Sequence, residues 1–174
     1  MRLILLLAIV LPVFSFATQT KRVPLPKELQ GDMIPYFFAS KIDGDDIYRE
    51  DLKKMMKPGT KRIVLSFFTT WCAICKENFV IMKKNAGELE KNGVQVYLIN
   101  IGADDFGKIE KVVKEFAGNA FPFYSKKRED FLEKDLGLEI FYPTKIILDA
   151  DLRVLAVLTG KLGDDFPRVL WGEF

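Results

Sequence analysis

Apolar residues occur along this chain in short runs separated by polar stretches, and their spacing distinguishes strands from helices. Residues 62–68 and 94–101 are mostly apolar and rich in β-branched and aromatic side chains, which is typical of strands buried on both faces of a sheet. Between them, residues 75–89 place apolar side chains at helical spacing, which predicts an amphipathic helix with one buried face. This alternation of strand and helix predicts an α/β domain.

The rest of the chain fits a mixed sheet with helices on both faces. Asp43-Gly44 is a turn pair between two aromatic segments and predicts a small hairpin. A short helix is expected over residues 51–56, stopped by Pro58-Gly59. The later elements expected are a helix carrying Ile109, Val112, Val113 and Phe116 and capped by Asp104 or Asp105, a strand over residues 121–124, a short helix over residues 130–136, and a pair of strands over residues 144–148 and 154–158.

The first residues are typical of an export signal. Arg2 gives a positive start, residues 3–16 are apolar or small, and Ala17 lies at a position that a signal peptidase reads. The apolar run is shorter than the ~20 residues that span a bilayer, and Pro12 interrupts it. We therefore expect a signal peptide over residues 1–17 and a mature protein that is periplasmic or otherwise exported, where disulfides form. An uncleaved N-terminal membrane anchor is the alternative.

Length and composition limit the classes to which this protein can belong. Its 174 residues suffice for one domain with a substantial core, and we expect an extended lead-in over residues 18–35 and a folded domain over residues 36–174. The 26 basic and 24 acidic residues leave a formal net charge of +2, so no nucleic-acid partner is predicted. The absence of histidine excludes imidazole catalysis and histidine-ligated metal sites.

The two cysteines of the chain, Cys72 and Cys75, follow the strand over residues 62–68 and begin the next helix. A Cys-x-x-Cys motif at this place indicates a redox site, because the unpaired N–H groups and the dipole of a helix start favour a thiolate. We expect Cys72 to be the exposed nucleophile. Cys75, one turn further along, is expected to be the resolving thiol that closes the disulfide and releases the partner. This chemistry needs no metal or organic cofactor.

Three alternative roles for the cysteine motif have weaker support. A purely structural disulfide would close a very small loop and restrain the unfolded chain little. A tetrahedral zinc site needs four ligands, and the chain offers two cysteines and no histidine. Thr69 and Cys72 match the Thr-x-x-Cys element of peroxidatic cysteines, but Leu65 stands where that pattern has a proline.

Taken together, these motifs resemble the exported thiol–disulfide oxidoreductases of the TlpA/ResA-like family. The resemblance extends from about residue 34 to residue 160 and includes the leading hairpin, the cysteine motif, and an additional strand–helix segment around residues 102–116. It implies an α/β, thioredoxin-like fold over residues 36–174. Such a fold has a mixed central β-sheet flanked by helices, here with an N-terminal hairpin and an inserted strand–helix segment.

The resemblance also implies a place for substrate. It includes Trp71 directly before the cysteine pair and the sequence Tyr142-Pro143-Thr144 at the start of the penultimate strand. By the resemblance, Pro143 is cis and lies against the two cysteines. The backbone of Tyr142 would then pair with an extended substrate chain, and Trp71 would flank the exposed sulfur.

Several positions depart from the family pattern. Ile74 replaces a common proline before the second cysteine. Asn78 replaces a common acidic residue, with Glu77 one place away on a different face of the helix. Ser66 stands at the buried position six residues before the first cysteine, where thioredoxin has a carboxylate. The usual proton acceptor for Cys75 is therefore missing, and the sequence does not identify a substitute.

Two positions near the end of the resemblance have simple expectations. Lys145 follows the proline motif and is placed to attract a thiolate, but a solvated lysine at a strand edge is the simpler expectation, because isolated surface charges usually contribute little. Leu152-Arg153 stand where the closing turn of the family carries glycine, which predicts a wider hairpin.

The sequence as a whole predicts an exported thiol–disulfide oxidoreductase that reduces disulfides of periplasmic proteins. By the resemblance, its partners are protein disulfide substrates, with apocytochrome c in cytochrome c maturation as one candidate, and a membrane-bound thiol reductase that supplies electrons. We expect a monomer. A periplasmic disulfide oxidant or isomerase is the alternative enzyme. A non-catalytic thioredoxin-fold adaptor, in which the cysteines are incidental, is the alternative from another functional class.

Overall fold

The computed structural model describes residues 21–23, 34, 37–43, 46–126, 137–138, 141–163 and 166–170. The predicted signal peptide and the helix predicted over residues 130–136 lie outside the described residues. In chain order, the elements are β1 (Lys21–Val23), β2 (Phe38–Asp43), β3 (Asp46–Asp51), α1 (Leu52–Met55), β4 (Arg62–Phe68), α2 (Ala73–Lys84), α3 (Ala86–Lys91), β5 (Val94–Asn100), α4 (Phe106–Phe116), β6 (Phe123–Ser125), β7 (Thr144–Asp149), β8 (Val154–Thr159) and α5 (Phe166–Leu170).

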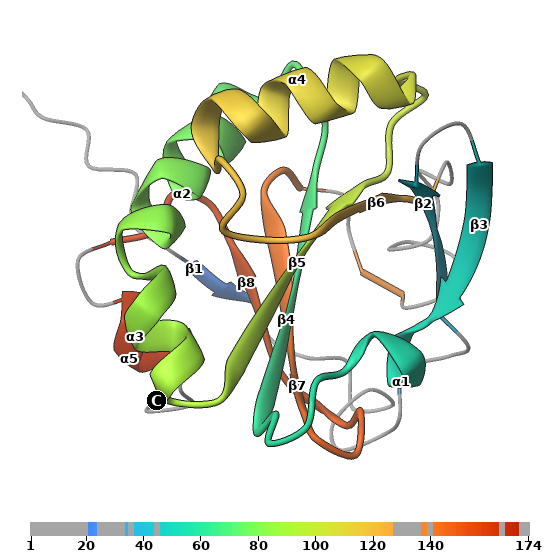
Figure 1. The fold of residues 1–174 in the computed structure, drawn as a ribbon. Coiled ribbons are helices and arrows are strands. Elements are labelled where there is room, and N and C mark those ends of the chain that lie inside the picture. Colours follow the sequence, from blue (N-terminus) through green and yellow to red (C-terminus); the bar gives the residue numbers. More distant parts are fainter. Residues whose placement is uncertain are drawn as a thin grey trace, which may run out of the picture.

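The strands of the described chain form one mixed sheet in the order β1-β8-β7-β4-β5-β6-β2-β3 (Figure 1). β4 is parallel to β5 and antiparallel to β7, and β5 is parallel to β6. The other neighbouring pairs are antiparallel. The predicted mixed sheet is therefore confirmed. Its interior strand β4 ends just before the cysteine pair, so the most buried part of the sheet positions the start of α2.

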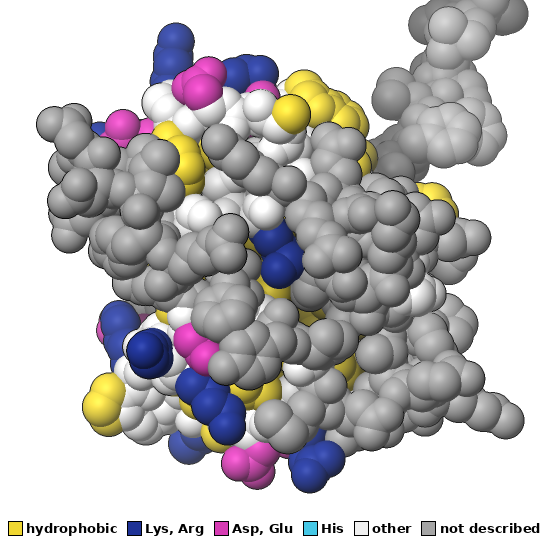
Figure 2. Space-filling model, turned by 90° about the vertical axis from the view of Figure 1, so that its right-hand side faces the viewer, with side chains coloured by type: hydrophobic (Ala, Val, Ile, Leu, Met, Phe, Trp, Pro, Cys, Tyr) yellow, Lys and Arg dark blue, Asp and Glu magenta, His cyan; other side chains and the backbone are white. Residues whose placement is uncertain are grey.

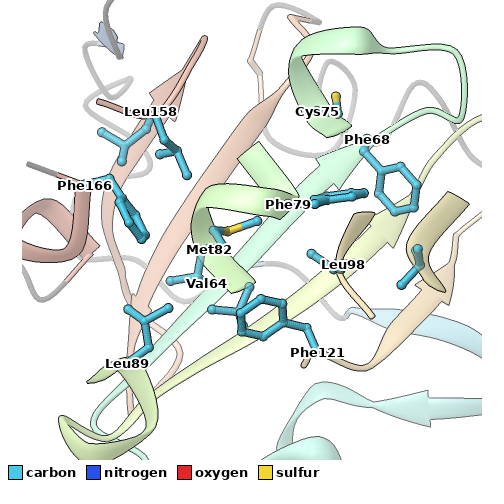
Figure 3. Packing of buried hydrophobic residues seen from close by; sticks show 14 of the residues in the cluster. Val64, Phe68, Cys75, Phe79, Met82, Leu89, Leu98, Phe121, Leu158 and Phe166 are labelled. Atoms are coloured by element: carbon cyan, nitrogen blue, oxygen red, sulfur yellow. The ribbon is translucent and has the colours of Figure 1, made fainter. Parts of the chain in front are cut away.

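Alternate side chains of β4 contribute to two hydrophobic clusters, because successive residues of a strand point to opposite faces of the sheet. Leu65 belongs to a cluster that includes Leu52 of α1. Val64 belongs to a second cluster, which receives side chains from α2, α3, α4 and α5 (Figure 3). Helices thus cover both faces, as the sequence predicted. The members of the second cluster that Figure 3 labels are Val64, Phe68, Cys75, Phe79, Met82, Leu89, Leu98, Phe121, Leu158 and Phe166.

The helix predicted over residues 75–89 is in fact two helices, α2 and α3, separated at Asn85. The side-chain amide of Asn85 donates to the carbonyl of Ile81 at 2.9 Å. An asparagine side chain that bonds nearby backbone competes with the regular helical pattern, and this residue ends α2. The prediction of one continuous helix was wrong, although Phe79 and Leu89 are buried as the spacing indicated.

Both predicted hairpins are present, one formed by β2 and β3 and one by β7 and β8. In the second hairpin Leu152 has a φ of 66°, a left-handed conformation in which glycine is more common. The carboxylate of Asp149 accepts the N–H groups of Asp151 and Arg153, each at 2.9 Å. These two bonds hold the turn although it contains no glycine.

Part of the lead-in joins the sheet. β1 pairs with β8 in antiparallel fashion, with Lys21 opposite Thr159. The segment is extended, as its prolines indicated, but the sequence did not predict an added edge strand. Three residues carry too weak a periodicity for such an assignment.

Charges of both signs are interspersed on the face shown in Figure 2, among the side chains that the structure describes. This distribution agrees with the small formal net charge of +2. Within the described ranges, the structure contains no helix with the length and apolar character that a membrane span requires.

Candidate redox site at the start of helix α2

Cys72 is the N-cap residue of α2, and its sulfur accepts a hydrogen bond from the backbone N–H of Cys75 at 3.1 Å. The two residues are joined by a disulfide with an S–S distance of 2.06 Å and a Cα–Cα distance of 5.3 Å. Unpaired N–H groups at a helix start favour negative charge on an atom in this position. The predicted placement of the cysteine pair at a strand-to-helix junction is confirmed.

The burial of Cys72 differs from the prediction. We expected an exposed sulfur, but Cys72 is 5% exposed and Cys75 is 1% exposed. Both belong to the hydrophobic cluster beneath α2, and Tyr142 packs against that cluster. Figure 3 shows Cys75 at one end of the cluster, on the same helix as Phe79. In this disulfide-bonded form the expectation of exposure was wrong, because long-range packing covers a residue that its local sequence leaves open.

Aromatic side chains lie beside the cysteine pair. The ring of Trp71 is 68% exposed and meets the ring of Tyr142 edge to face, with centroids 5.6 Å apart. Phe141, which directly precedes Tyr142, is 51% exposed. The Tyr142–Pro143 peptide bond is cis, which confirms that part of the prediction. The role of these residues in holding substrate stays a prediction.

Asn78, which replaces a common acidic residue of the family, and its neighbour Glu77 lie on different faces of α2. Asn78 is fully buried; its amide nitrogen donates to the carbonyl of Gly160 at 3.1 Å, and its amide oxygen accepts the N–H of Leu162 at 2.8 Å. Asn78 therefore ties α2 to the segment after β8. Glu77 is exposed and pairs with Lys161 at 2.7 Å, so it lies on a different helix face, as predicted.

Lys145 is fully buried, which contradicts the expectation of a solvated strand-edge lysine. The expectation failed because β7 is an interior strand between β4 and β8, an arrangement that local sequence does not reveal. The ammonium nitrogen donates to the carbonyl of Gly160 at 3.3 Å. Burial lowers the pKa of the Lys145 side chain from 10.5 to about 7.

Asp104 holds the loop that precedes the cysteines. Its carboxylate accepts the N–H of Thr70 at 3.2 Å, the amide of Asn100 at 3.4 Å and the ammonium of Lys108 at 2.6 Å. Burial raises the pKa of this carboxyl, but hydrogen bonds from Lys108, Thr70 and Asn100 outweigh burial and lower the pKa below 3.8. The helix cap is Asp105. The sequence offered both aspartates as caps and did not reveal that Asp104 braces the active-site loop.

A hollow of about 660 Å³ lies at the other end of the sheet. Its walls include Thr60, two residues before β4, and Val94, the first residue of β5, whereas the cysteines follow the end of β4. Neither cysteine lines it. The hollow therefore has no part in the chemistry of the disulfide.

Comparison with known proteins agrees with this geometry. The sequence matches the redoxin family over residues 48–169, more than half of the chain. It is 25% identical over 134 residues to the thiol–disulfide oxidoreductase ResA of Bacillus subtilis, which covers 76% of this chain and 69% of that protein. The chain is also 25% identical to ResA of Geobacillus kaustophilus over 171 residues. This alignment covers 97% of this chain and 89% of that protein.

Solved structures show the same fold. A protein from Chlorobium tepidum, described as a candidate thiol:disulfide interchange protein DsbE, superposes with a TM-score of 0.64 at 20% identity, covering 86% of this chain and 96% of that one. The thioredoxin domain of a Bacteroides vulgatus thiol–disulfide oxidoreductase gives a TM-score of 0.62 at 16% identity, covering 83% and 94%. The predicted thioredoxin-like fold and TlpA/ResA-like resemblance are confirmed. The chain belongs to the redoxin family and is a thiol–disulfide oxidoreductase.

Proposed function

We propose that this protein is an exported reductase of protein disulfides, with Cys72 as nucleophile and Cys75 as resolving thiol. The observation that carries the proposal is the position of the cysteine pair. The Cys72 sulfur caps α2 and accepts the Cys75 N–H. In the reduced form this bond and the helix dipole would favour a thiolate on Cys72 and make it the better nucleophile.

The proposed reaction has two exchange steps. The Cys72 thiolate attacks a sulfur of the substrate disulfide, and the other substrate sulfur leaves as a thiolate that takes a proton. Cys75 then attacks the Cys72 sulfur, which forms the disulfide seen in the structure and releases the second substrate thiol. The protein dithiol loses two electrons and the substrate disulfide gains them. Ser66 and Asn78 are uncharged, so neither supplies the base that the second step needs.

The aromatic surface around the pair supports a polypeptide substrate. Trp71 and Phe141 are exposed and Tyr142 is partly buried between the surface and the cysteine-bearing cluster. Exposed aromatic rings beside a reactive group provide contact area at low entropic cost. Pro143 and the backbone of Tyr142 would align an extended substrate, and apocytochrome c is one candidate. A membrane-bound thiol reductase would restore the dithiol, and we propose that the protein acts as a monomer.

The proposed location rests on the N-terminal sequence. Residues 1–17 combine a positive start, an apolar run and small residues at a cleavage site. The structure does not describe these residues. An exported reductase needs a supply of electrons, because its surroundings favour disulfides.

The redox equilibrium of the Cys72–Cys75 pair tests the proposed direction of electron flow. The mature protein is equilibrated with glutathione or dithiothreitol buffers, and the disulfide fraction is measured. We expect a potential near or below about −250 mV, as for reductants of this fold. A value between about −180 and −120 mV would instead assign an isomerase or oxidant. Failure to form the disulfide reversibly would exclude both enzymes and favour the adaptor.

A further inference from the structure

Lys145 and Ser66 lie side by side on one face of the sheet. Lys145 pairs directly with Ser66 across β4 and β7, and directly opposed residues in a sheet point to the same face. Its neighbour two places along, Ile147, belongs to the hydrophobic cluster that contains Cys75. Because residues two apart in a strand share a face, Lys145 and Ser66 both face α2.

The ammonium nitrogen of Lys145 lies under the first turns of α2. It donates to the carbonyl of Gly160 at 3.3 Å, and the amide of Asn78 donates to the same carbonyl at 3.1 Å. Asn78 follows Cys75 by three residues, so the two side chains are neighbours on the buried face of the helix. Gly160 also donates its N–H to the carbonyl of Pro143 at 3.1 Å. The backbone of Gly160 is therefore hydrogen-bonded to Lys145, to Asn78 of α2 and to Pro143.

The surroundings of Lys145 favour the neutral amine. Within the described residues its one hydrogen-bond acceptor is the Gly160 carbonyl, and it forms no ion pair with a carboxylate. Among the described residues, Ser66 of β4 and Leu158 of β8 pair with Lys145, and Asn78 of α2 shares its acceptor; none of these three is ionisable. Cys75 belongs to the same buried face of α2, one turn before Asn78. A buried ammonium with so few partners is costly, and burial lowers the pKa of Lys145 to about 7.

We propose that Lys145 is the base that removes the proton of Cys75 when this thiol attacks the mixed disulfide. The inference rests on the proposed function, in which Cys75 is the resolving thiol. The proton moves from the Cys75 sulfur to the Lys145 nitrogen, and Cys75 forms a bond to the Cys72 sulfur. The bond between Cys72 and the substrate sulfur breaks, and its electron pair leaves with the substrate thiolate. The resulting lysine ammonium then returns its proton to the departing thiolate or to water.

Transient kinetics with dithiobis(nitrobenzoate) isolate this step. Reduced protein releases one nitrothiobenzoate when Cys72 attacks, at a rate that depends on reagent concentration. It releases a second nitrothiobenzoate when Cys75 attacks the Cys72 sulfur, at a rate that is independent of reagent concentration. For the wild type we expect the second phase to rise with pH and to level off just above pH 7, where the lysine becomes an amine.

Lys145→Met removes the amine and keeps an unbranched side chain. We expect the second phase to slow by about a hundredfold at pH 7 and to rise tenfold per pH unit toward the pKa of an unassisted thiol, at or above about 8.5. The first phase should change much less. Lys161→Met is the matched control, since this lysine is exposed, lies one residue after Gly160 and pairs with Glu77. It should leave both phases unchanged.

The outcomes separate the two proposals. If both equivalents are released and Lys145→Met leaves the second phase and its pH profile at wild-type values, the lysine is not the base and the proposed dithiol stands. If the wild type releases one equivalent and closes no disulfide, the proposed function fails and the inference fails with it. Should Lys145→Met not fold, the wild-type profile decides, because a rate that keeps rising tenfold per unit to pH 9 contradicts the lysine base.

Discussion

Replacing Cys72 by serine should abolish disulfide reduction, while replacing Cys75 by serine should stop the reaction halfway. Without Cys72, no thiolate occupies the N-cap of α2, where the helix stabilises negative charge. We expect turnover to fall by more than about a thousandfold, since the nucleophile itself is lost. The measurement is reduction of a protein disulfide such as that of insulin, with a thiol reductant as electron donor.

Cys75→Ser should retain the first exchange and lose the second. Its Cys72 is expected to form one covalent adduct per molecule with the substrate, which mass spectrometry of the non-reduced digest locates. Each variant serves as a control for the other, because both lose the same internal disulfide. Recovery of the adduct on Cys75 in Cys72→Ser, and of none on Cys72 in Cys75→Ser, would reverse the assigned roles.

Phe79→Ala should produce a large loss of stability. Phe79 is fully buried, follows Cys75 by one helical turn, and meets the ring of Phe68 edge to face at 5.0 Å between centroids. Figure 3 shows the two rings side by side in the cluster. Truncation would leave a cavity and remove these contacts, at a cost of about 3–5 kcal/mol in the free energy of unfolding. Urea denaturation of the oxidised protein measures this cost.

The neighbouring Val80 supplies the control. It is on the same helix but is 37% exposed, so Val80→Ala should cost less than about 1 kcal/mol. Comparable losses for the two variants would mean that the α2 face of the sheet does not depend on Phe79. Such a result would also contradict the packing that holds the first turn of α2 in place.

Local patterns predicted those parts of the fold that local chemistry determines. The apolar run of β4, the Cys-x-x-Cys motif at its end, and the Asp43-Gly44 pair each act within a few residues. The structure has the strand, the helix that begins at the motif, and the β2–β3 hairpin on either side of the pair. The cis bond at Pro143 was predicted from the family resemblance and is present. The signal peptide and the helix over residues 130–136 lie outside the described residues, and those predictions stay open.

Features that depend on distant packing were missed. The burial of Cys72 arises from the cluster and Tyr142, which join the site from remote sequence positions. The burial of Lys145 arises from the strand order, which makes β7 an interior strand. The bracing role of Asp104 needs the loop at Thr70 to lie beside it. A charged residue directly before the apolar run of residues 146–148 was the one sequence signal for Lys145, and the sheet topology was needed to interpret it.

Alkylation rates of the two cysteines in the reduced protein test the central claim most directly. Iodoacetamide labelling is followed by mass spectrometry for each cysteine between pH 5 and pH 9. We expect Cys72 to react faster than a free thiol near pH 6, because its thiolate caps α2. We expect Cys75 to react slowly, because it lies within α2 and does not occupy the cap position. Equal, slow labelling of both cysteines, with the pH dependence of ordinary thiols, would contradict a nucleophilic Cys72 and favour an adaptor.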